Sequence, residues 1–137
     1  MALFGNKAER DAQRTVVNQA VADKMEERAN NAHSEEVKGL LLDGEEVLKI
    51  QSVLADYAVV TTERLIFVDG NYAIINKKRK IVSIFFRHIH EVSFNYNDIA
   101  VNEVEIVTAH EKYELKMGNK ELAKRFAMEL MEQMRKK

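Results

Sequence analysis

The sequence contains one concentrated group of charges, a basic run at residues 77–80. Residues 71–90 hold five Lys or Arg residues and no acidic residue. The candidate anion-binding residues are Lys77, Lys78, Arg79, Lys80 and Arg87. Such a cluster attracts anionic lipid headgroups, at about 1 kcal/mol per basic residue near a charged surface. It also suits nucleic-acid phosphates, but only Tyr72 stands beside it for base stacking. The alternative is a solvated turn and strand entry whose charges keep a sheet edge from aggregating.

Two other pairs of residues have spacings that could support chemistry. His88 and His90 would share one face if they lay in a strand and could then ligate a metal, but no third ligand is placed near them, and we interpret them as partly exposed histidines beside the basic run. Glu103 and Glu105 also share a face, and we interpret them as the solvated side of an edge strand. No Gly-rich phosphate loop and no nucleophile-elbow serine is present. The sequence therefore predicts neither an enzyme, nor a metal site, nor a cofactor.

The composition narrows the class of protein further. The 137 residues suffice for one domain with a real core, with 46% hydrophobic and 31% charged residues. A net charge of −1 gives no overall attraction to nucleic acid or membrane. The absence of cysteine rules out disulfides and thiolate chemistry and suits a cytoplasmic location. We expect a cytoplasmic protein that is membrane-peripheral if the basic run meets lipid.

The elements that would position these residues begin with a helical arm. Residues 6–38 lack glycine and are rich in good helix formers, with a narrow stripe of small apolar side chains. That stripe consists of Ala12, Val16, Val17, Ala20, Val21 and Met25. Asn30-Asn31 predicts a break, Ser34 a new N-cap, and Asp43-Gly44 the end of a second short helix.

From Glu45 the apolar period changes from that of a helix to that of strands. The predicted strands are residues 47–54, 57–61, 64–68, 80–86, 91–96, 101–108 and 112–117. Asn119 then caps a final helix, on which Leu122, Phe126, Leu130 and Met134 recur every four residues. Its wide apolar stripe is suited to packing on a sheet. Seven short strands at close spacing indicate a bent antiparallel sheet or partial barrel.

The second and third predicted strands are apolar on both faces. Residues 57–60 and 65–68 do not alternate, as an antiparallel strand with one solvated face should. A second cover is therefore needed, either the N-terminal helices of the same chain or another subunit. The sequence leaves both open, because the stripe of the arm is too narrow to supply the whole cover.

Seven strands followed by one C-terminal helix is the order of a pleckstrin-homology-like (PH-like) barrel. The segments Leu42–Val47, Thr61–Asp69 and Lys77–Val92 resemble the pattern of apolar and fixed polar positions in the bacterial PH domain family. This resemblance covers about residues 40–135 and implies an α+β, PH-like fold, together with a tendency to form oligomeric rings. Residues 1–38 are not explained by it. The short, acidic turn Ala55-Asp56 argues against phosphoinositide binding, since lipid-binding members carry basic residues there.

We therefore predict an N-terminal helical arm, residues 1–42, and a PH-like domain, residues 43–137. The predicted function is a non-enzymatic assembly and protein-interaction module that forms homo-oligomers and meets a protein or peptide partner. The alternative is a peripheral membrane module that binds anionic lipid through Lys77–Lys80. Nucleic acid is the partner that the sequence supports least.

Overall fold

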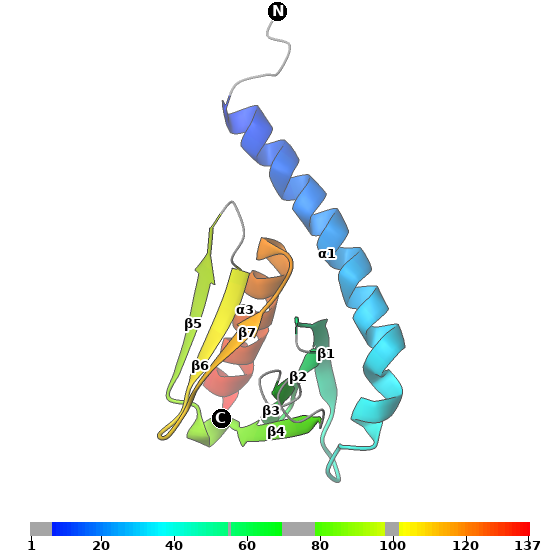
Figure 1. Cartoon of the computed structure of the whole chain (residues 1–137), viewed down its shortest axis with the longest axis vertical. Helices are drawn as coiled ribbons and strands as arrows, with labels where there is room; N and C mark the ends of the chain where they lie inside the picture. Colours follow the sequence, from blue (N-terminus) through cyan, green and yellow to red (C-terminus); the bar gives the residue numbers. More distant parts are fainter. Residues whose placement is uncertain (1–6, 55, 70–78, 98–101) are drawn as a thin grey trace, which may run out of the picture.

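A computed structural model of the chain describes residues 7–54, 56–69, 79–97 and 102–137. It begins with one long helix, α1 (Lys7–Lys38), which runs along one side of the domain and extends well beyond it (Figure 1). The predicted break at Asn30-Asn31 and the second helix from Ser34 are wrong, because α1 is continuous to Lys38. Both asparagines are exposed. Their low helix propensity costs a few tenths of a kcal/mol each, which the burial of Ala29 and Val37 on either side outweighs.

The strands form two antiparallel sheets. The first has the order β1-β2-β3-β4 and the second the order β5-β6-β7. Their bounds are β1 Val47–Ser52, β2 Tyr57–Thr61, β3 Arg64–Asp69, β4 Lys80–Phe85, β5 Glu91–Tyr96, β6 Asn102–Val107 and β7 Lys112–Lys116. A short 3-10 turn, η1 (Phe86–His88), joins the two sheets. The predicted bent, seven-stranded PH-like architecture is confirmed.

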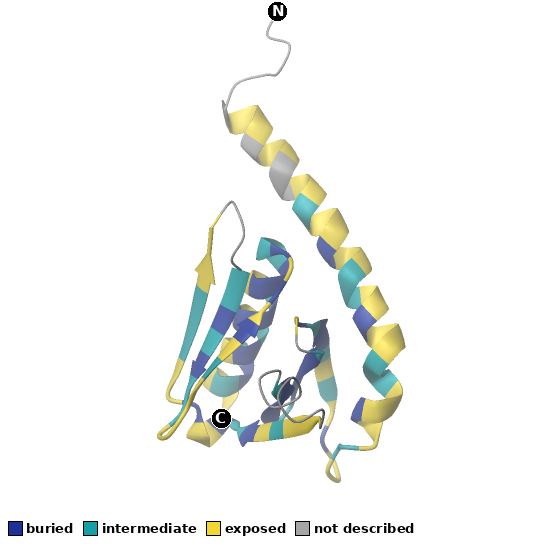
Figure 2. Cartoon of the chain, in the orientation of Figure 1, coloured by how far each residue is buried: buried dark blue, intermediate teal, exposed yellow. Residues whose placement is uncertain are grey.

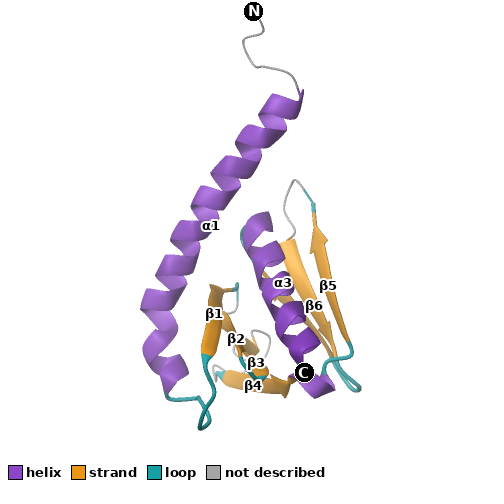
Figure 3. Ribbon diagram, turned by 180° about the vertical axis from the view of Figure 1, so that it is seen from behind, coloured by secondary structure: helices purple, strands orange, loops and turns teal. Residues whose placement is uncertain are grey.

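The C-terminal helix α3 (Lys120–Lys136) covers one face of the second sheet (Figure 3). The predicted cap is present, since the Asn119 side chain accepts hydrogen bonds from the backbone N–H groups of Glu121 and Leu122. The predicted stripe also faces the sheets, with Leu122, Phe126 and Leu130 fully buried. The helix thus closes a core between the sheets, to which β2, β3, β6 and β7 contribute side chains.

The two-sided burial of β2 and β3 is confirmed. All five residues of β2 are buried. Alternate residues face the core under α3, and Tyr57, Val59, Ile66 and Val68 face a second cluster on the other side of the sheet. Ala29 and Val37 of α1 belong to that second cluster, with Leu40 packed at its margin. The second half of α1 therefore supplies the missing cover from within the same chain.

No helix in the described ranges is long and apolar enough to cross a membrane.

The closure by α3 can be measured through Phe126, which is fully buried in the core. Phe126→Ala should lower the free energy of unfolding by about 3–5 kcal/mol, because it removes apolar contacts and leaves a cavity. Met128→Ala on the same helix is the control, since that side chain is 56% exposed and the change should stay within about 0.5 kcal/mol. Urea denaturation of both variants gives the comparison. Equal losses would contradict the assignment of the buried face.

Candidate interaction surface

Of the predicted basic residues, the structure describes Arg79, Lys80 and Arg87. Lys77 and Lys78 lie outside the described residues. Arg79 and Arg87 flank β4 at its opposite ends, and a six-residue strand spans about 20 Å. Arg87 is exposed, with its guanidinium 5.1 Å from the Phe85 ring centroid. Lys80 is exposed at the start of β4, opposite Asp69 in the ladder.

Arg79 is bound by acidic residues of its own chain. Its guanidinium donates to both carboxylate oxygens of Glu36 on α1, at 2.7 and 2.8 Å. It also pairs with Asp56 of the β1–β2 turn at 2.8 Å. The buried Tyr57 hydroxyl donates to the same Glu36, and the His33 ring stacks on Tyr57 at 4.6 Å. Arg79 thus fastens the end of α1 to the first sheet.

The charges of this network depend on one another. Hydrogen bonds from Arg79 and Tyr57 hold the pKa of Glu36 below its usual range. Burial, and next the bond to Glu36, raise the pKa of the Tyr57 hydroxyl. The bond to Glu36 likewise raises the pKa of Arg79. The guanidinium of Arg79 is thus already held by the Glu36 carboxylate and by Asp56, which weakens its attraction for an external anion.

The histidine pair is exposed, as interpreted from the sequence, whereas the glutamate pair does not lie on an edge strand. His88 ends η1 and His90 lies between η1 and β5, both exposed, so they do not share a strand face. Glu103 and Glu105 are on β6, the middle strand of its sheet and not an edge. Their carboxylates gather with that of Glu114, with ligand atoms within 4.8 Å of one another. Exposed acidic clusters of this kind are common without a metal, and Lys112 neutralises Glu105 at 3.4 Å.

A buried ion pair stands where the chain passes from α1 into β1. The Glu45 side chain is fully buried and accepts from Arg64 Nε at 2.8 Å and Nη2 at 2.9 Å. The Thr61 hydroxyl donates to Glu45 at 2.6 Å, and the Leu42 backbone N–H at 3.0 Å. Arg64 also donates to the Leu40 carbonyl oxygen. The pair therefore joins the end of α1 to β2 and β3.

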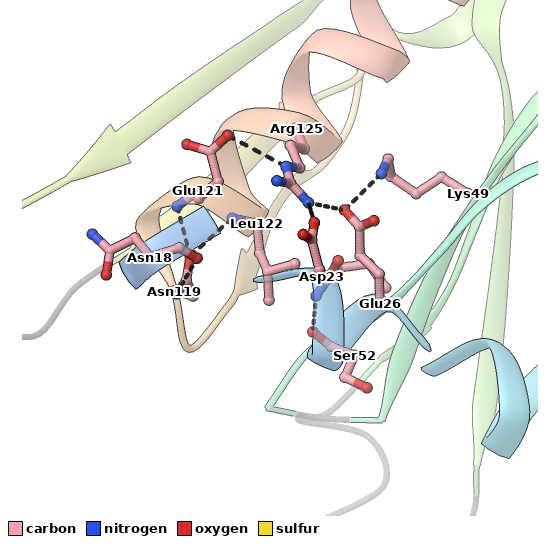
Figure 4. A network of polar contacts seen from close by, with 10 residues as sticks. Asn18, Asp23, Glu26, Lys49, Ser52, Asn119, Glu121, Leu122 and Arg125 are labelled. Carbon is pink, nitrogen blue, oxygen red and sulfur yellow. Dashed lines mark hydrogen bonds and ion pairs between the residues drawn. The ribbon is translucent and has the colours of Figure 1, made fainter. Parts of the chain in front are cut away.

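A third network holds the middle of α1 against α3 and β1 (Figure 4). Arg125 of α3 pairs with Asp23 at 2.8 Å and Glu26 at 3.2 Å, and Lys49 of β1 pairs with the same Glu26 at 3.0 Å. Near the start of α3, the Asn119 amide donates to the Asn18 carbonyl oxygen at 3.4 Å. From about Asn18 onward, α1 is therefore attached to its own domain.

The first half of α1 is largely exposed where the structure describes its side chains. Its described side chains from Ala8 to Val21 are exposed apart from the half-buried Asn18 (Figure 2). Four small apolar residues form one exposed row on this half, here called the valine strip: Val16, Val17, Ala20 and Val21. The three valines are 64%, 60% and 43% exposed. The apolar stripe could be read from the sequence. The point where α1 leaves the domain could not, because it depends on contacts between distant residues, such as the pair Asp23–Arg125, 102 residues apart.

Two antiparallel sheets closed by a C-terminal helix define the PH-like class of domains. The chain belongs to the bacterial PH domain family, whose model matches residues 16–132. The match extends further upstream than residue 40, into α1. A search of the curated proteins finds no match.

Two solved structures share the fold. One is a DUF1696 family protein with a pleckstrin-homology domain from Shewanella loihica PV-4, 21% identical with a TM-score of 0.54. The alignment covers 76% of this chain and 91% of that one. The other is a pleckstrin homology domain from Shewanella amazonensis SB2B, 21% identical with a TM-score of 0.54. It covers 73% of this chain and 84% of that one.

The buried Glu45 should make the free energy of unfolding depend on pH in the acid range. Burial works to raise its pKa, but hydrogen bonds from Arg64, Thr61 and Leu42 hold the pKa below the usual range. The resulting stability is present above the unfolded pKa of about 4.3 and is lost as pH falls through the lower folded pKa. Glu45→Gln should cost about 3–5 kcal/mol at pH 7, because Arg64 stays buried without its counter-ion. The difference from wild type should shrink below about pH 4. A constant difference between pH 7 and 3 in urea titrations would contradict this.

Arg79 should act on stability through its attachment to α1. Arg79→Gln should lower the free energy of unfolding by about 1 kcal/mol, since the network is partly solvated. Arg87→Gln is the matched control, with the same chemical change at an exposed position where, among the described residues, the contact with the Phe85 ring is lost. Thermal or urea unfolding of both variants gives the comparison. Equal stability of the two variants would refute a fastening role for Arg79.

Proposed function

We propose that this chain is a non-enzymatic PH-like module whose task is association with other protein chains, beginning with copies of itself. One observation carries the proposal, the exposed valine strip on the half of α1 that extends beyond the domain. Thirty-two helical residues measure about 48 Å, so this half stands clear of the sheets (Figure 1).

The projecting half of α1 gains less stability from packing than the half that lies against the domain. Isolated helices shorter than about 12–15 residues are marginal in water, and valine is a weaker helix former than leucine or alanine. Exposed apolar side chains gathered in one row mark interaction surfaces. Other exposed apolar residues are more isolated, such as Leu54 in the β1–β2 turn, or are a pair on α3, Met128 and Met131. The valine strip combines exposed apolar area with an element that projects from the domain.

Membrane binding through the basic run receives less support. Of the predicted cations, Arg79 is paired with Glu36 and Asp56, and Arg87 lies at the far end of β4. The attraction of about 1 kcal/mol per basic residue applies to cations free to approach the lipid surface. An assembly module therefore fits the described residues better than a peripheral lipid-binding module.

Light scattering at micromolar concentration tests the proposal. The wild type should have a mass of at least twice the 15.8 kDa of one chain. The double variant Val17→Asp, Val21→Asp should lose mass, because two carboxylates would be desolvated in the contact. The matched control is Ala8→Asp, Gln19→Asp, which adds the same charge at exposed positions of the same helix half outside the strip. A monomeric wild type, or equal effects of the two double variants, would refute the proposal.

A further inference from the structure

We infer that the free edge of β5 binds an extended, acidic segment of a different protein, which adds to the second sheet as a further strand beside α3. This surface is separate from the valine strip, so the inference goes beyond the proposed function. β5 is the outermost strand of its sheet, and among the described residues it pairs with β6 alone (Figure 1). A strand edge offers its backbone N–H and C=O groups to another extended chain.

The hydrogen bonds of the sheet show which backbone groups of β5 point outward. Asn102 of β6 lies opposite Tyr96, but its carbonyl oxygen accepts from the backbone N–H of Met117, directly after β7, at 2.8 Å. Because each residue of an antiparallel strand directs its N–H and C=O to one side only, the pair Tyr96–Asn102 is not hydrogen-bonded. The N–H and C=O of Tyr96 therefore point away from β6. The pattern repeats every two residues, so those of Phe94 and Val92 do the same.

The same three residues of β5 turn their side chains toward α3. Val92 and Phe94 are half-buried against the core that α3 covers. The Tyr96 ring stacks on Phe94 at 5.0 Å, and Tyr96 remains 52% exposed. Outward backbone groups and apolar side chains thus occur at the same positions, where an added strand could pair and pack at once.

The flank of α3 beside this edge is open. Lys120, at the start of α3, places its Nζ 3.9 Å from the centroid of the Tyr96 ring. Met131 lies three helical turns further along, only about 20° from Lys120 around the axis, and is 39% exposed. α1 packs on the other flank, through Arg125. The edge of β5 is therefore bordered by a helix with an exposed methionine at one end and a cation at the other.

The cations on this flank specify an acidic occupant. Lys120 is half-buried and Lys124, one turn later, is exposed. Neither lysine has an ion pair within the part of the chain that the structure describes. The nearby acidic Glu121 is directed to the α1 side, where it pairs with Arg125 at 3.3 Å. A partner segment with carboxylates near Lys120 and Lys124 and apolar side chains further along would complement the surface, because carboxylates form charge-assisted hydrogen bonds with lysine.

The directed backbone groups favour a polypeptide over a lipid surface. Lysines, a methionine and an exposed tyrosine would also suit an anionic membrane. A membrane, however, offers no regular row of donors and acceptors to pair with Val92, Phe94 and Tyr96, whereas an extended chain offers one at the same two-residue spacing.

A peptide selected from a random library displayed on phage against the wild-type chain supplies the probe. Its sequence should alternate apolar residues with others and include acidic residues, and fluorescence polarisation gives its Kd. Lys120→Glu, Lys124→Glu should raise the Kd at least about tenfold, because both charge contacts are lost. The matched control is Lys136→Glu, Lys137→Glu, with the same change of charge at exposed positions at the other end of the helix. This control should leave the Kd unchanged.

A second pair of variants tests the added strand itself. Tyr96→Pro removes an outward N–H that makes no bond to β6, so the sheet should keep its own ladder. Tyr96→Ala is the matched control, since it removes the ring and keeps the N–H. Tyr96→Pro should raise the Kd about tenfold above that of Tyr96→Ala. Circular dichroism checks that both fold. If Tyr96→Pro does not, N-methylation of alternate peptide residues replaces it, and only one of the two alternate sets should abolish binding.

The outcomes separate this inference from the proposed function. No selected binder, or equal Kd values for Tyr96→Pro and Tyr96→Ala, would overturn the added strand. Vesicles of equal parts phosphatidylserine and phosphatidylcholine that bind the wild type and Tyr96→Pro alike, but not Lys120→Glu, Lys124→Glu, would assign this flank to lipid and overturn the inference. Loss of the peptide in Val17→Asp, Val21→Asp would place its binding on the valine strip and also overturn it. None of these results alters the mass of the wild type, on which the proposed function is tested.

Discussion

The arrangement of the whole chain depends on the buried pair of Glu45 and Arg64. A carboxylate and a guanidinium taken out of water cost several kcal/mol each, and their attraction repays this only when every remaining donor and acceptor is satisfied. Here the satisfying groups come from the end of α1, the loop before β1, β2 and β4, since Ser83 also accepts from Arg64 at 2.9 Å. The pair therefore determines the geometry of this junction more than it adds to the stability of the fold. It fixes where α1 ends relative to the first sheet.

The direction of the rest of α1 follows from that fixed end, because α1 is one continuous helix. Its buried residues are small, Ala22 and Ala29, which brings the helix axis close to β1 and places Glu26 within reach of Lys49 and Arg125. Polar contacts at Asn18, Glu26 and Glu36 hold α1 from Asn18 onward, and apolar burial of Val37 completes the cover of the sheet. Because a continuous helix keeps its direction, the first half is carried past the domain. The exposure of the valine strip is thus a consequence of how the second half is anchored.

Most elements could be predicted from the sequence because their signals are local. The alternation in β7, the Asn119 cap and the four-residue repeat of α3 each depend on neighbouring residues, and all were confirmed. The helix break was wrong because two asparagines are a weak local signal, and packing of Ala29 and Val37 decided the outcome. In the sequence the basic run has no acidic residue beside it. Nothing in the sequence indicates that Glu36, 43 residues away, binds Arg79 in the folded chain. Likewise, β6 became the central strand of its sheet through pairings that periodicity does not reveal.

Contacts between distant residues also explain why the candidate surface lies on α1 and not on the sheets. A small domain with a net charge of −1 has acidic residues available for most of its cations, and folding brings Arg79, Arg125 and Arg64 to such partners. Each pairing attaches α1 or its junction to the domain and removes a cation from the surface. Electrostatic attachment of the arm and electrostatic capture of an anionic ligand therefore compete for the same side chains. Arg79 is used in this attachment, and the large apolar side chains left exposed on the described part of α1 are the three valines of the valine strip. The proposed function therefore assigns this apolar strip, and not the basic run, to contact with another protein surface.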